Sequence, residues 1–76
     1  MTRPNLTPWY AVGSGYRRSQ RAPYAELEAY PTRAGWRWRV DRIAPGSGRF
    51  RAVADGVAAN ERAAKAAAVA AAARLR

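Results

Sequence analysis

The chain has 76 residues, enough for one small domain but close to the size at which a single core barely holds a fold. It contains no cysteine and no histidine, which excludes disulfides, thiolate metal sites and histidine bases. No apolar run approaches the ~20 residues of a membrane span, and the start lacks the apolar segment of a signal peptide. We therefore expect a cytoplasmic protein, of a bacterial cell or a phage-infected host, that holds no metal or other cofactor.

Charge is the strongest signal in the composition. Fourteen lysines and arginines face five acidic residues, which gives a net charge of +9 at pH 7. A small domain with this excess binds polyanions at low salt. The serines have no neighbouring base to activate them, so we do not expect an enzyme. These features predict a non-enzymatic nucleic-acid-binding protein.

The first quarter of the chain shows little periodicity. Residues 1–8 contain two prolines and predict an extended N-terminal arm, followed by one domain over residues 9–76. Residues 9–12 are aromatic and β-branched, which indicates a short first or edge strand. Glycines at 13 and 15 end it, and residues 16–21 are expected to form a basic loop. Its arginines are candidate phosphate contacts: Arg17, Arg18 and Arg21.

Residues 23–31 allow two interpretations. Their helix-favouring composition, with Pro23 suited to a first helical position, indicates a short helix. The alternation of Ala25, Leu27 and Ala29 with polar or aromatic residues indicates a strand. Flanking prolines leave too few residues for a good helix, so the strand is favoured. The two glutamates between these residues are expected to form salt bridges instead of acting as catalysts.

Two alternating runs, 36–43 and 49–56, surround a Pro-Gly-rich turn at 44–48 and predict a β-hairpin. If Ile43 lies opposite Arg49, aspartates face arginines across the strands, which favours this register. The same register puts Trp36, Trp38 and Phe50 on one buried face. The other face then exposes four arginines: Arg37, Arg39, Arg49 and Arg51.

Residues 60–76 predict a C-terminal helix, because alanine has the highest helix propensity and Asn60 is a preferred N-cap. One side of this helix is small, with Ala64, Ala67, Ala68, Ala71 and Leu75, and should lie on the sheet. The opposite side carries Arg62 and Lys65 and should face solvent. The predicted class is α+β, with an antiparallel sheet of three or four strands and one alanine-rich helix on one face.

The helix start Asn60-Glu61-Arg62-Ala63-Ala64-Lys65-Ala66-Ala67-Ala68, after three strand-like segments, resembles the last helix of double-stranded-RNA-binding domains. In that family the basic residues here straddle phosphates, which would make Arg62 and Lys65 ligand contacts. The same order of elements is similar to the arm-binding domains of phage and transposon integrases. There the sheet enters the DNA major groove, which would make Arg37, Arg39, Arg49 and Arg51 the contacts.

The sequence thus predicts binding of nucleic acid, with duplex DNA favoured over RNA, through the sheet arginines and the 16–21 loop. The alternative is a phage-encoded interaction module or inhibitor that docks its basic surface on an acidic patch of a host protein. Binding to a membrane surface is not expected, because alanine supplies little apolar area for insertion.

Overall fold

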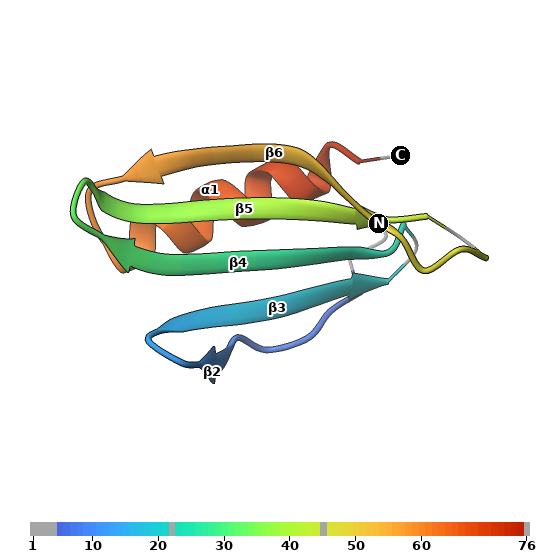
Figure 1. The fold of residues 1–76 in the computed structure, drawn as a ribbon, viewed down its shortest axis with the longest axis horizontal. Coiled ribbons are helices and arrows are strands. Elements are labelled where there is room, and N and C mark those ends of the chain that lie inside the picture. Colours follow the sequence, from blue (N-terminus) through green and yellow to red (C-terminus); the bar gives the residue numbers. More distant parts are fainter. Residues whose placement is uncertain (1–4, 22, 45, 76) are drawn as a thin grey trace.

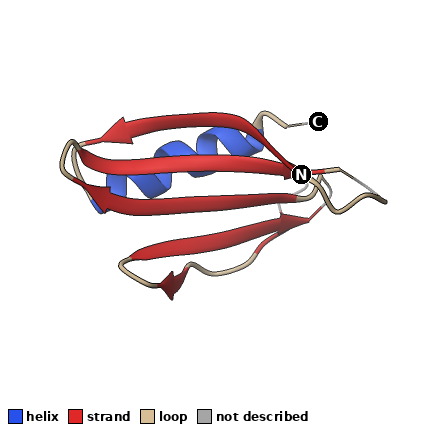
Figure 2. Cartoon of the chain, viewed as in Figure 1, coloured by secondary structure: helices blue, strands red, loops and turns tan. Residues whose placement is uncertain are grey.

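Alternating buried and exposed residues build one antiparallel sheet with a helix on one side (Figures 1 and 2). The computed structural model describes residues 5–21, 23–44 and 46–75. The elements, in chain order, are β1 (Asn5–Leu6), β2 (Tyr10–Val12), β3 (Gly15–Arg21), β4 (Ala25–Thr32), β5 (Gly35–Ile43), β6 (Phe50–Ala58) and α1 (Glu61–Ala73).

The strands follow the order β1-β3-β4-β5-β6. β2 pairs with β3 as well, further along the same edge that β1 occupies. All pairings are antiparallel. The α+β class with a C-terminal helix on one sheet face is confirmed, although the sheet is larger than expected. The ambiguous segment 23–31 contributes a strand, β4, and the predicted edge strand at 9–12 is β2. Of the predicted arm, the described part lies along β3, where the Thr7 backbone N–H donates to the Ser19 carbonyl at 2.9 Å.

Small residues form the core between α1 and the strands β4, β5 and β6 (Figure 2). Alternation turns one side of β4 toward the helix, and Leu27 and Val40 are the largest fully buried side chains. On the helix every fourth residue is buried, which is the period expected of a single contact stripe. The fully buried alanines are Ala25, Ala29, Ala64, Ala68 and Ala72.

Gly56 on β6 brings Trp38 into this core. A Cβ added to Gly56 would lie 2.8 Å from the indole ring, so the ring lies directly over the glycine backbone. Trp38 and Gly56 are also direct cross-strand partners. A side chain at position 56 would push the ring toward the helix.

The start of α1 is fixed by its cap and by its contacts. The Asn60 side chain accepts a hydrogen bond from the Ala63 N–H at 2.9 Å, as predicted. Lys65 was expected to face solvent, but its side chain is half-buried. Its ammonium lies 3.7 Å from the centre of the Tyr16 ring and bonds Glu61 at 3.1 Å. Tyr16 in turn stacks on Trp36 with ring centres 6.3 Å apart. This cation–aromatic group ties the helix start to β3 and β5.

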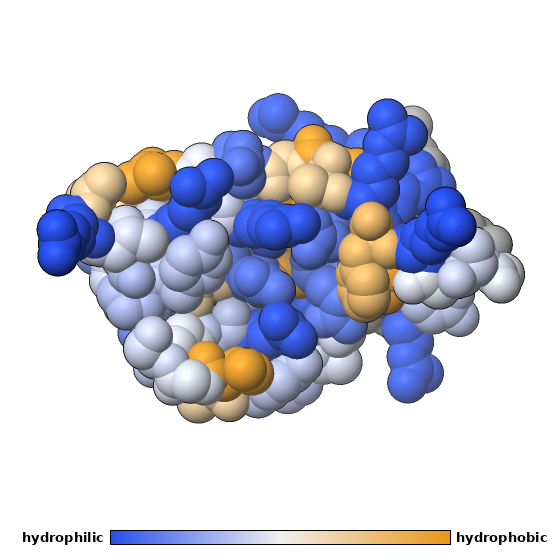
Figure 3. Space-filling view, in the orientation of Figure 1, coloured by the Kyte–Doolittle hydropathy of each residue, from blue (hydrophilic) through white to orange (hydrophobic). Residues whose placement is uncertain are grey.

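No helix covers the other side of the sheet, which we call the outer face; Figures 1 and 3 look onto it. Hydrophilic side chains cover its middle, with separate apolar side chains nearer the rim (Figure 3). The strand pairings arrange four rows across β3, β4, β5 and β6. From one end of the sheet to the other they are Arg21–Tyr24–Ile43–Phe50, Ser19–Glu26–Asp41–Ala52, Arg17–Glu28–Arg39–Asp55 and Gly15–Tyr30–Arg37–Val57.

The predicted hairpin register is wrong at its first pair, Ile43 with Arg49, and the observed register also shifts within β6. Ile43 lies opposite Phe50, but Val40 lies opposite Ala54, so Val53 is an extra residue in the strand. This β-bulge reverses the alternation before it. Phe50 is therefore on the outer face, 61% exposed, and not under the helix. Arg51 lies opposite Arg42 on the side that bears the helix.

Residues 16–21 are also not a loop. They belong to β3, which hydrogen-bonds β4 on one side and β1 and β2 on the other. Being a strand, the segment separates its arginines, because neighbouring side chains point to opposite faces. Arg17 points to the outer face, whereas Arg18 points to the helix side, where its guanidinium lies 5.7 Å from the centre of the Trp9 ring.

Candidate nucleic-acid interface

The middle of the outer face carries arginines that are already paired with carboxylates. Arg17 meets Glu28 at 2.8 Å, and Arg37 meets Asp55 at 3.1 Å. Arg39 bonds Asp41 at 2.7 Å, and this hydrogen bond, with the charge of Asp41, raises the pKa of Arg39. The row Arg17–Glu28–Arg39–Asp55 alternates in sign along its whole length. Each of these three arginines therefore already has a carboxylate partner.

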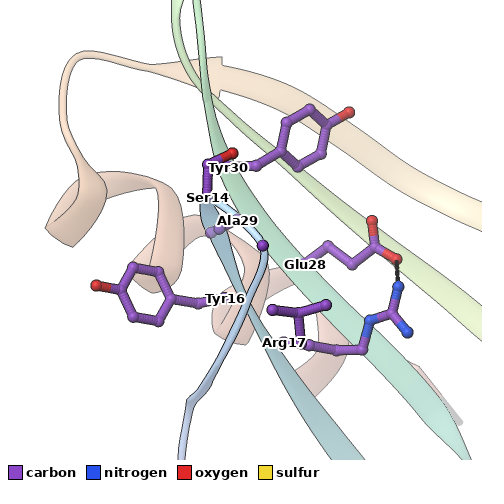
Figure 4. Close-up of a pocket in the computed structure, with 9 residues that line it drawn as sticks. Ser14, Tyr16, Arg17, Glu28, Ala29 and Tyr30 are labelled. Atoms are coloured by element: carbon purple, nitrogen blue, oxygen red, sulfur yellow. Dashed lines mark hydrogen bonds and ion pairs between the residues drawn. The ribbon is translucent and has the colours of Figure 1, made fainter.

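A shallow hollow of about 320 Å³ opens on this face beside the β2–β3 turn (Figure 4). Its charged groups are Arg17 and Glu28, joined by the ion pair drawn in Figure 4, and Tyr30 and Ser14 add hydroxyl groups. Next to it, and sharing Arg17 and Glu28 with it, a second hollow of about 330 Å³ is lined by three carboxylates, Arg17, Arg39 and Phe50. Neither hollow contains a nucleophile with an adjacent base.

The other predicted contact residues, Arg18 of β3 and the helix-start pair Arg62 and Lys65, lie apart from the arginines of the outer face. Arg18 is half-buried, and its guanidinium is held by the Thr7 carbonyl, to which it donates, and by the Trp9 ring. Lys65 is half-buried among aromatic rings, whereas Arg62, next to it in the predicted phosphate clamp, is exposed. The structure thus does not bring the helix-start residues and the outer-face arginines into one surface.

A different set of arginines gathers at one end of the molecule, which we call the basic end. There β3 and β5 finish, β4 and β6 begin, and α1 ends, as the amide of Gln20 donating to the Ala72 carbonyl at 3.4 Å shows (Figure 1). Among the described residues none of these arginines makes an ion pair. The set is Arg21, Arg42, Arg49, Arg51 and Arg74.

Two members of the basic end are direct cross-strand neighbours. Arg42 lies opposite Arg51 in the β5–β6 pairing. Like charges in this position repel and destabilise a sheet. The nearest carboxylates in the register are those of Glu26 and Asp41, one row further along and on the opposite face. Such an arrangement is relieved when an anion binds between or beside the two guanidinium groups.

Arg21, Arg49 and Arg51 were among the predicted contacts, but Arg42 and Arg74 were not. A signal for Arg42 exists in the sequence, because it follows Trp38 and Val40 at a spacing of two and so belongs to their face. Arg74 could not be assigned to this set from the sequence, because the predicted helix continued past it, whereas the observed helix ends at Ala73 and leaves Arg74 at the basic end.

Over 5–21, 23–44 and 46–75 there is no group of three or more acidic, histidine or cysteine side chains that could hold a metal ion. Within those ranges, no helix has the length and apolarity needed to cross a membrane. Comparisons of the chain with protein-family models, with curated proteins and with solved structures give no match.

Proposed function

We propose that the protein binds nucleic acid, without catalysis, and that the basic end makes the phosphate contacts. The observation that carries this proposal is the contrast between the five arginines of the basic end and the ion-paired arginines of the outer face. Guanidinium groups bind phosphate oxygens in a forked geometry and lose little of that capacity through hydration. An arginine with a carboxylate partner has to give up that partner first.

The arrangement at the basic end supports a multivalent anion as the ligand. Arg42 and Arg51 repel each other across the strands, and Arg49, Arg21 and Arg74 extend the positive charge around the same end. The C-terminal end of α1 carries about half a negative charge, which offsets only part of this excess. A chain of phosphates carries several negative charges spread over a distance that one small anion cannot span, so it can contact all five arginines at once.

The remaining acidic groups argue for binding without chemistry. Glu28, Asp41, Asp55 and Glu61 are in ion pairs, and Glu26 accepts a hydrogen bond from Ser19 at 2.9 Å. Carboxylates held in this way are directed at neighbouring side chains of the protein and not at a reacting group.

Fluorescence anisotropy with labelled oligonucleotides over a salt series tests the proposal. Affinity should fall with a log–log slope of about −3 to −5, because each neutralised phosphate contributes about 0.7 to 0.9. A slope near zero, or absence of binding at ~0.1 M salt, would contradict it. Capture of an acidic protein from nuclease-treated lysate, together with a flat salt series, would instead support the rival interaction module.

A further inference from the structure

The row of the outer face nearest the basic end is unlike the other three. Phe50 is 61% exposed and lies opposite Ile43. Tyr24 is 54% exposed, and its carbonyl accepts the Ile43 N–H at 3.0 Å, which holds the turn before β4 against the end of β5. Two exposed aromatic rings therefore flank an aliphatic side chain on three neighbouring chain segments.

This row, Tyr24–Ile43–Phe50, is bordered by arginines. Arg21 continues it on β3, because Gln20 pairs with Ala25 and the next positions are Arg21 and Tyr24. Arg49 precedes Phe50, and its carbonyl is fixed to the Ala44 N–H at 3.0 Å. The rings thus sit beside the phosphate-binding groups proposed above.

Exposed aromatic rings among arginines suit unpaired bases. In a duplex both faces of each base are covered by its neighbours, whereas a single strand can stack its bases on protein rings. Adjacent strands are about 4.8 Å apart, so Tyr24 and Phe50 are separated by roughly 10 Å, enough for separate bases. Because both rings are carried on hydrogen-bonded backbone, little conformational freedom is lost on binding.

The charges determine which side of a bound strand, its phosphates or its bases, faces the rim of the sheet. Glu26 and Asp41 form the next row inward, and with Phe50 they line the second hollow. Phosphates are repelled from these carboxylates and attracted to the arginines at the rim. The sugar–phosphate chain therefore runs along the basic end, and its bases turn inward over the rings.

We infer that the ligand of the basic end is single-stranded nucleic acid, with bases stacked on Tyr24 and Phe50. This inference rests on the proposed function, and it makes the duplex expected from the sequence the alternative that experiment decides. A second copy of the chain on the same apolar row is the other outcome to separate, because exposed rings also serve self-association.

The test uses labelled oligothymidylate of about 12 nucleotides, within the range that small domains cover, and a duplex of the same length. Wild-type protein should bind the single strand at least about tenfold more tightly at ~0.1 M salt. Phe50→Leu should weaken that binding by roughly tenfold, since leucine is apolar but has no aromatic face, whereas Phe50→Trp should retain it. Tyr24→Leu and Tyr24→Phe form the matching pair.

Tyr10→Leu is the control, because Tyr10 is 46% exposed on β2, remote from the basic end, and its loss should leave affinity unchanged. Circular dichroism verifies that each variant is folded. Equal affinity for both ligands with no effect of Phe50→Leu overturns the inference but leaves the proposed function standing. Loss of binding to both ligands defeats the proposed function itself. A free protein that is dimeric by sedimentation, and becomes monomeric in Phe50→Leu without loss of affinity, assigns the row to self-association and also overturns it.

Discussion

The middle of the outer face and the basic end both contain arginines, but their surroundings differ. In the middle, Arg17, Arg37 and Arg39 each have a carboxylate within 3.1 Å. At the basic end Arg42 lies opposite Arg51 instead. A pairing that stabilises the sheet uses up the charge, whereas repulsion leaves the charge for a ligand at some expense in stability. A count of arginines alone does not distinguish the two regions.

The largest effect should come from removing the facing pair. Arg42→Ala with Arg51→Ala should weaken binding about 25- to 60-fold at ~0.1 M salt, since each phosphate contact contributes about five- to eightfold relative to 1 M. The slope of log affinity against log salt should become shallower by about two. Anisotropy titrations measure both quantities. The control removes the same charge from the middle of the face, in Arg17→Ala with Arg37→Ala, and an equal loss there would contradict the comparison.

Neutralising carboxylates should turn the middle of the face into a binding surface. Glu28→Gln with Asp55→Asn leaves Arg17 and Arg37 without the partners they have now. Affinity for the single strand should rise by about tenfold at low salt, because two further arginines can meet phosphates. Glu61→Gln, at the helix start, is the control for a general change in net charge. An unchanged affinity would show that the face does not reach the ligand.

The pairs should also differ in what they contribute to folding. Arg17→Ala leaves the half-buried Glu28 carboxylate without its cation and should lower the free energy of unfolding by about 1 kcal/mol. Arg49→Ala breaks no ion pair between described residues and should change it by less than about 0.3 kcal/mol. Urea unfolding, repeated at high salt where the difference should shrink, measures this. The reverse order of the two variants would contradict the assignment.

The smallest effect on binding is expected at Arg37. Its pair with Asp55 is exposed on both sides, so Arg37→Ala should change stability by less than about 0.5 kcal/mol. Affinity should change less than about twofold, because its charge is already offset by Asp55. If Arg37→Ala instead abolished binding, the middle of the sheet would be the interface, as the resemblance to integrase arm-binding domains implies.

Much of the fold follows from local patterns. Alternation predicts the strands around Leu27 and Trp38, and the cap at Asn60 begins the helix as expected. β3 is missed because its side chains are polar on both faces. On its helix side, Arg18 and Gln20 lie at the rim of the core, where polar groups find partners in Thr7 and Ala72.

The register of the hairpin could not be obtained in the same way. Ala52 and Ala54 flank Val53, and either alanine fits equally well on a covered or an open face. Charge pairing therefore decided the prediction, and it favoured an Asp41–Arg51 pair. In the structure Asp41 is satisfied by Arg39 on its own strand. The sides of Phe50 and Arg51 were predicted wrongly for this reason, since the bulge decides which side chains the basic end displays.

The bulge at Val53 acts as a phase shift between two halves of one strand. Beyond it, Ala54, Gly56 and Ala58 supply the smooth surface that the helix and Trp38 require. Before it, the same alternation runs out of step, and an aromatic ring comes to the open side. If the pairing with β5 ran on through Val53 without a bulge, the two sides of the strand's first half would be exchanged, with Phe50 inward and Arg51 outward. Core and display surface can thus change independently along a single strand, with one residue as the point where they separate.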